Sequence, residues 1–184
     1  MVRKAIVLAA VAAALSAACG DGGNGGATPT ASPTDAGGST GATGGSPPPT
    51  PAAGWTGSAG FDMSGGVTAR ADLTMVIDTV SLDPDELVVV WTDEAGGTFL
   101  AILWTGTRPP ELGVPLEGFL VNITTPETRG FGSYSDYAGG CTVTLDTFDE
   151  DGMSGSFACT DLELPDGQLP PVEASGNFGV SRTG

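Results

Sequence analysis

The hydrophobic pattern of residues 55–184 is that of short β-strands separated by turns. Clusters of Gly, Pro, Asp and Ser recur at short intervals, and no segment keeps the helical period of about 3.6 residues over the length of a helix. This combination is typical of an all-β domain, either a single antiparallel β-sandwich or a barrel-like fold. We predict about eight strands, at 55–62, 67–77, 87–91, 99–104, 119–125, 141–148, 153–164 and 172–180.

Two neighbouring strands are apolar on both faces. The segment 67–77 alternates apolar and polar side chains, as a strand with one solvated face does, whereas 87–91 and 99–104 carry apolar residues at successive positions. We expect both of these strands to be central in their sheet or covered. Because a sandwich of this length needs only one face of each sheet buried, the second apolar face requires a partner, a covering loop or a ligand.

The segments 141–148 and 153–164 are predicted to form a hairpin closed by a disulfide bond. With a three-residue turn at 149–151, Cys141 lies directly opposite Cys159. A bulge at Gly152 would make the two cysteines diagonal neighbours, still on one face of the sheet. An oxidising compartment permits the bond, which adds about 3 kcal/mol in the chain-entropy model. Two buried free thiols are the alternative.

The N-terminal residues have the three parts of a secretory signal peptide. Arg3 and Lys4 are positively charged, residues 5–15 form an apolar run, and residues 16–18 are small. The apolar run is shorter than the roughly 20 residues of a transmembrane helix. We therefore predict a signal peptide over residues 1–18.

A cysteine follows these small residues directly. The segment Leu15-Ser16-Ala17-Ala18-Cys19 resembles the lipobox of bacterial lipoproteins, in which the cysteine thiol receives a diacylglyceryl group and becomes the mature N-terminus. The family usually has leucine three residues before the cysteine, where this chain has Ser16. The resemblance implies a secreted lipoprotein, held at the extracytoplasmic face of the cell membrane by lipid on Cys19.

Residues 19–54 are predicted to be a disordered tether between this lipid and the β domain. Gly, Pro, Ala, Ser and Thr dominate the segment, and no large apolar side chain is present to offset the entropy cost of ordering it. A coil of this length spans roughly 30–35 Å root-mean-square.

Composition excludes several classes of function. Residues 1–18 hold two of the six basic residues and none of the 22 acidic ones, so the predicted mature chain has a net charge of 4 − 22 = −18. Such a chain repels nucleic acids and anionic lipid headgroups. It contains no His, and Lys4 is removed with the signal peptide, so the side chains for a catalytic triad, a Schiff base or a zinc site are missing. We predict a protein that is not an enzyme and has no cofactor or metal; paired carboxylates of the glycosidase type are the remaining catalytic alternative.

Two acidic clusters, 83–86 and 149–152, are candidates for calcium binding. Calcium takes about six to eight oxygen ligands, often from alternate residues of one loop. Neither cluster has the D-x-[DN]-x-[DN]-G spacing, and both fall where a turn is expected, so we interpret them as turns.

These features predict a membrane-anchored cell-envelope lipoprotein whose β domain is a non-catalytic binding or structural module. Its expected partners are the membrane, through the lipid, and an envelope protein, glycan or lipid ligand. The alternative is a carrier of an apolar small molecule or lipid within the β domain. An enclosed apolar cavity favours the carrier, and a filled core favours the module. A Gly-rich loop with Tyr134 and Tyr137 is a further candidate contact surface.

Overall fold

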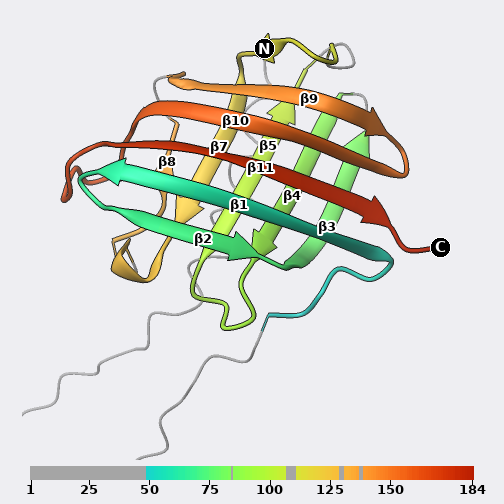
Figure 1. Cartoon of the computed structure of the whole chain (residues 1–184), viewed down its shortest axis with the longest axis horizontal. Coiled ribbons are helices and arrows are strands. Elements are labelled where there is room, and N and C mark those ends of the chain that lie inside the picture. The colour runs from blue at the N-terminus through green and yellow to red at the C-terminus, as the bar shows by residue number, and fades with distance from the viewer. Residues whose placement is uncertain (1–48, 84, 107–110, 129–130, 137–138) are drawn as a thin grey trace, which may run out of the picture. The chain divides into compact units, whose positions relative to one another are not determined.

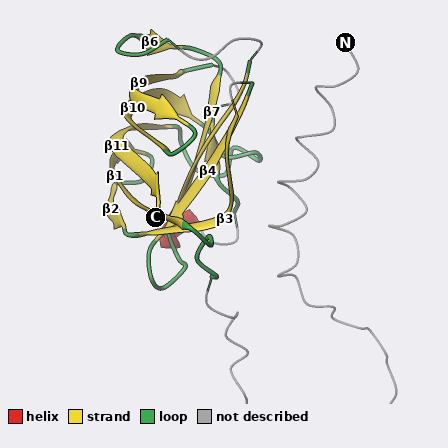
Figure 2. Ribbon diagram, turned by 90° about the vertical axis from the view of Figure 1, so that its right-hand side faces the viewer, coloured by secondary structure: helices red, strands yellow, loops and turns green. Residues whose placement is uncertain are grey.

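The computed structural model describes residues 49–83, 85–106, 111–128, 131–136 and 139–184. They form two antiparallel sheets packed face to face, a β-sandwich (Figures 1 and 2). The six-stranded sheet has the order β2-β1-β11-β10-β9-β6, and the five-stranded sheet has the order β3-β4-β5-β7-β8. The strands are β1 Trp55–Gly65, β2 Ala69–Leu73, β3 Met75–Asp83, β4 Glu86–Thr92, β5 Phe99–Thr105, β6 Pro115–Leu116, β7 Phe119–Thr124, β8 Tyr134–Ser135, β9 Cys141–Asp149, β10 Gly152–Leu162 and β11 Val172–Arg182, and a 3-10 turn covers Pro126–Thr128.

The predicted antiparallel sandwich is confirmed, with eleven strands in the described residues instead of about eight. Two of the additional strands, β6 and β8, are very short. The third arises because the prediction of one strand over 67–77 is wrong. The chain breaks at Thr74, and β2 pairs with β1 in one sheet whereas β3 pairs with β4 in the other. Leu73 and Val76 both face the core, so the alternation changes phase where the chain crosses between the sheets.

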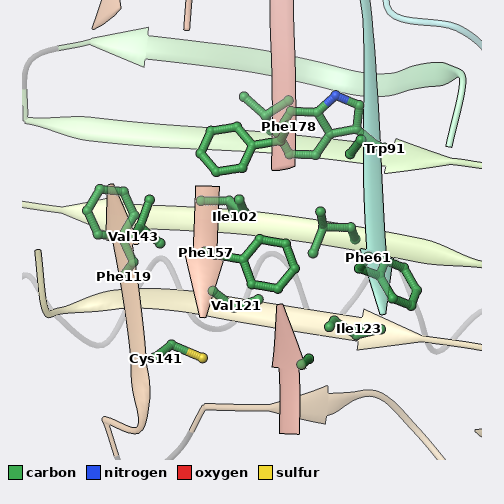
Figure 3. Close-up of a cluster of buried hydrophobic side chains, with 14 of the residues drawn as sticks. Phe61, Trp91, Ile102, Phe119, Val121, Ile123, Cys141, Val143, Phe157 and Phe178 are labelled. Atoms are coloured by element: carbon green, nitrogen blue, oxygen red, sulfur yellow. The ribbon is translucent and has the colours of Figure 1, made fainter. Parts of the chain in front are cut away.

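The core lies between the two sheets and is built from alternate residues of each strand. Trp91 of the five-stranded sheet is fully buried and reaches the other layer. Its indole Nε1–H donates a hydrogen bond to the carbonyl oxygen of Gly179 at 3.0 Å. Its ring centroid lies 5.6 Å from that of Phe178 (Figure 3). One side chain therefore fixes the position of β4 against β11.

Glycine residues make room for aromatic rings in the six-stranded sheet. Phe157 lies opposite Gly176, and Phe178 lies opposite Gly155. A Cβ atom at Gly176 would come within 2.9 Å of the Phe157 ring, and one at Gly155 would come within 3.0 Å of the Phe178 ring. These two pairs let large rings from β10 and β11 fill the core at close packing density.

Cys141 and Cys159 form the predicted disulfide bond and lie directly opposite each other. The predicted three-residue turn is wrong, because residues 150 and 151 alone connect β9 and β10. An extra residue on β9, Asp146, bulges out of the ladder and restores the register that pairs the cysteines. Both cysteines are buried in the core.

The predicted signal peptide, Cys19 and the tether as far as residue 48 lie outside the described residues. At the described end of the tether, Pro51 pairs with Ile77, and the N–H of Ala52 donates to the carbonyl oxygen of Val76 at 2.9 Å. The chain thus enters the domain beside β3, at an edge of the five-stranded sheet. No helix within the described ranges is long and apolar enough to cross a membrane.

Candidate binding surface

The five-stranded sheet carries apolar side chains on the face that points away from the core. These residues alternate with core residues along β3, β4, β5 and β7, and they belong neither to the core cluster nor to the half-buried residues packed against it. We call this set the outer apolar face. It consists of Met75, Ile77, Val88, Val90, Phe99, Ala101, Leu103 and Leu120.

The strand register brings the residues of the outer apolar face together. Ile77, Val90 and Ala101 are successive cross-strand partners in one row, and Val88 and Leu103 are partners in the next row. Partners directly opposite each other have Cβ atoms about 4.5–5.5 Å apart, which is contact distance for these side chains. Polar residues interrupt it at two places, since Thr92 lies between Met75 and Phe99 and Asn122 follows Ala101 on β7. The face is therefore a mainly apolar surface across neighbouring strands rather than a set of scattered residues.

Contact within the sheet covers the outer apolar face only in part. Ile77 and Leu103 are 9% and 8% exposed, and the other members are half-buried. Among the described elements, the six-stranded sheet packs on the opposite side, so no second layer of strands covers this face (Figure 2). The sequence-based expectation that 87–91 and 99–104 are central is confirmed, since β4 and β5 are interior strands.

The outer face of the six-stranded sheet has the opposite character. Its outward positions on β1, β10 and β11 are occupied mainly by hydroxyl, amide and glycine residues, among them Ser58, Gly60, Ser154, Ser156, Ser175, Asn177 and Gly179. A solvated face of an antiparallel sheet normally has polar residues at these positions. The outer face of the six-stranded sheet is therefore polar, whereas that of the five-stranded sheet is mainly apolar.

Two hollows of about 570 and 470 Å³ lie on this polar face, where glycine residues lower the surface. They adjoin each other and share Ser58 and Gly179. Both are shallow and open to solvent. Neither is the enclosed apolar cavity that would favour a carrier, and between the sheets the core positions are filled by large side chains such as Trp91, Ile102 and Phe119 (Figure 3).

Acidic residues stand at both ends of the outer apolar face. The turn between β3 and β4 carries Asp83, Asp85 and Glu86. The turn between β4 and β5 carries Asp93 and Glu94. Because the strands of this sheet run between these two turns, the face is apolar in its centre and negatively charged at both ends.

The Asp93 carboxylate is held by its own turn. Its Oδ1 accepts a hydrogen bond from the N–H of Gly97 at 2.8 Å. Burial by itself would raise the pKa of this carboxyl, but hydrogen bonds from Gly97, Thr98 and Gly96 outweigh burial and lower the pKa below its ordinary value. This end of the face therefore carries a fixed negative charge at neutral pH.

The calcium candidates at 83–86 and 149–152 are turns, as interpreted from the sequence. In the second turn, the Arg182 guanidinium lies 3.8 Å from the carboxylate of Asp151. Across the ranges that the structure describes, no group of three acidic or sulfur-containing side chains converges to hold a metal ion.

The prediction of a contact surface at the Gly-rich loop is wrong for Tyr134, and Tyr137 lies outside the described residues. Tyr134 is fully buried, and its hydroxyl donates to the carbonyl oxygen of Pro170 at 3.1 Å. Burial raises the pKa of this phenol. Tyr134 is a core residue on β8, the edge strand of the five-stranded sheet.

A buried carboxylate that the sequence did not single out has a structural role. The two oxygens of Asp136 accept hydrogen bonds from the N–H groups of Gly140 at 2.6 Å and Cys141 at 2.9 Å. They position the start of β9, next to the disulfide bond. Paired backbone donors of this kind satisfy a buried carboxylate without any ligand.

Comparisons of the chain with protein-family models, with curated protein sequences and with solved structures found no match. The structure thus defines the class of fold, an antiparallel β-sandwich, and this class hosts many unrelated functions. Function is inferred below from the two outer faces and from the N-terminal sequence.

Adjacent valines on β4 test the assignment of the outer apolar face. We expect Val90→Thr to change the free energy of unfolding by less than about 0.5 kcal/mol, because the new hydroxyl stays solvated. Val89→Thr, the matched control on the inner face, should lower it by about 2 kcal/mol, because its hydroxyl is buried without a partner. Urea denaturation of both variants measures the difference. Equal losses would place Val90 in a packed core and contradict the assignment.

Proposed function

We propose that this protein is a membrane-anchored, non-catalytic module of the cell envelope that binds a partner through its outer apolar face. The observation that carries the proposal is the contrast between the two outer faces, one polar and one mainly apolar. Contiguous apolar patches on soluble domains mark interaction sites. An apolar outer face does not increase the solubility of a strongly acidic protein, so solubility does not account for it.

The filled core supports a module over a carrier of an apolar molecule. Leu87, Val89, Trp91, Ile102 and Val121 are all fully buried between the sheets. A carrier within the β domain would need room among these side chains. The hollows on the six-stranded sheet are open to solvent and therefore do not enclose an apolar cargo.

The membrane anchor in this proposal rests on the sequence. A signal peptide over residues 1–18 and a lipobox-like segment ending at Cys19 support acylation of Cys19 after export. No catalytic step is proposed, since the sequence after residue 18 has neither His nor Lys.

Removal of Cys19 tests the anchor. We expect the full-length protein, expressed in a bacterium that processes lipoproteins, to enter the detergent phase of a Triton X-114 separation. Cys19→Ala should move it to the aqueous phase, and Ser39→Ala in the tether should leave it in the detergent phase. An unmodified protein that partitions wholly into water would contradict the anchor.

Photocrosslinking in intact cells tests the binding surface. Benzoylphenylalanine in place of Val90 should give a discrete crosslinked product of higher mass, because Val90 lies near the centre of the outer apolar face. The same group in place of Ser58, on the polar face, is the matched control and should give none. Products from Ser58 and none from Val90 would move the binding surface to the other sheet.

A further inference from the structure

The charge at the two ends of the outer apolar face limits what can bind there, if the proposed function holds. Asp83 and Glu86 are cross-strand partners in the row at one end. Glu86 is in phase with Val88 and Val90, so its side chain lies on the outer face itself. From Glu86 to Asp93 the strand covers about 23 Å, at roughly 3.3 Å per residue.

Positive charge near this face is lacking in the part of the chain that the structure describes. The basic residues there are Arg70 and Arg182, which belong to β2 and β11 of the other sheet. Arg108, which follows β5 in the sequence, and Arg129, which follows the 3-10 turn, lie outside the described residues. Arg70 lies 3.8 Å from Asp62, and Arg182 forms the contact with Asp151 described above. The described charges around the outer apolar face are therefore acidic, and the five carboxylates at its two ends, Asp83, Asp85, Glu86, Asp93 and Glu94, outnumber Arg108 and Arg129.

A second copy of this chain does not complement the face. Two copies packed face to face would bring acidic turns together in an already strongly acidic protein, which opposes association. The face is roughly 15–20 Å wide and about 20 Å long by strand geometry, or about 300–400 Å². A stable interface buries about 800 Å² on each partner. An anionic lipid surface is repelled by the same charges.

We propose that the outer apolar face binds a protein segment that is apolar in its centre and carries Lys or Arg on both sides, about 20–25 Å apart. A strand of about seven residues or a helix of about fifteen has this length. Apolar contact supplies the stabilisation, and the flanking charges pair with the acidic turns to fix orientation and speed association.

Three labelled synthetic peptides of about fifteen residues test this inference. All three have a leucine-rich amphipathic centre, and they carry lysine, serine or glutamate at both ends. Fluorescence anisotropy measures their binding to the exported chain with Cys19→Ala, which removes the lipid. We expect the lysine peptide to bind about tenfold or more tighter than the serine and glutamate peptides, and its affinity to fall with added salt.

Variants assign the binding to the face and to its ends. Val88→Thr with Val90→Thr should weaken binding of the lysine peptide about tenfold. Glu86→Gln with Glu94→Gln should reduce the ratio of the affinities of the lysine peptide and the serine peptide several-fold. Ser58→Ala with Ser156→Ala is the matched pair on the polar sheet. It should change neither the affinity for the lysine peptide nor its ratio to the affinity for the serine peptide.

Other outcomes overturn the inference in distinguishable ways. Equal binding of the serine and lysine peptides, still weakened by the valine variants, removes the requirement for positive charge and leaves the proposed docking face standing. Binding of all three peptides that no valine variant weakens contradicts the docking face as well. A dimer in analytical ultracentrifugation that the valine variants abolish identifies a second copy as the occupant. Tighter binding to neutral phosphatidylcholine vesicles than to the lysine peptide identifies a lipid surface.

Discussion

A two-layered sandwich can bury only one face of each sheet, and this constraint shapes the whole molecule. The inner faces meet in a single core that is filled by large side chains. Each outer face must then be solvated or covered. The six-stranded sheet meets the constraint with hydroxyl, amide and glycine residues, whereas the five-stranded sheet presents apolar residues. The proposed function follows from this difference.

Specific contacts hold the two layers so that the outer faces are presented on a firm support. The Trp91 indole hydrogen bond to Gly179 ties β4 to β11. The disulfide bond between Cys141 and Cys159 clamps the end of the β9–β10 hairpin, and Asp136 holds the entry to it. A surface built on strands that are fixed in this way needs little ordering when it binds, which lowers the entropy cost of association.

Much of the fold follows from local patterns in the sequence, and the exceptions have physical reasons. The apolar runs at 87–91 and 99–104 correctly predict interior strands. The break at Thr74 escapes the pattern, because Val76 and Ile77 are both apolar and conceal the change of phase. The cysteines pair as predicted although the turn is shorter than expected, because the bulge at Asp146 compensates.

The candidate site is only partly predictable from the sequence. Apolar residues on both faces of two strands indicate that one face of their sheet is apolar without a second sheet packed on it. They do not indicate which other strands contribute residues to that face. Ile77 and Leu120 join the face through the register of β3 with β4 and of β5 with β7, which the pattern within one strand does not give. Tyr134 is misassigned for a similar reason, since its partner Pro170 is remote in the sequence.

Hydroxyl-radical footprinting on intact envelopes tests the central claim most directly, because Met75 and Phe99 on the outer apolar face are reactive reporters. If a partner occupies this face, both residues should be oxidised several-fold more slowly on the envelope than in protein purified from it. Leu112 and Phe131, which are 49% and 42% exposed outside this face, should react at the same rate in both samples. Equal oxidation of Met75 and Phe99 in the two samples would show that the face is open to water in its native setting and would contradict the account.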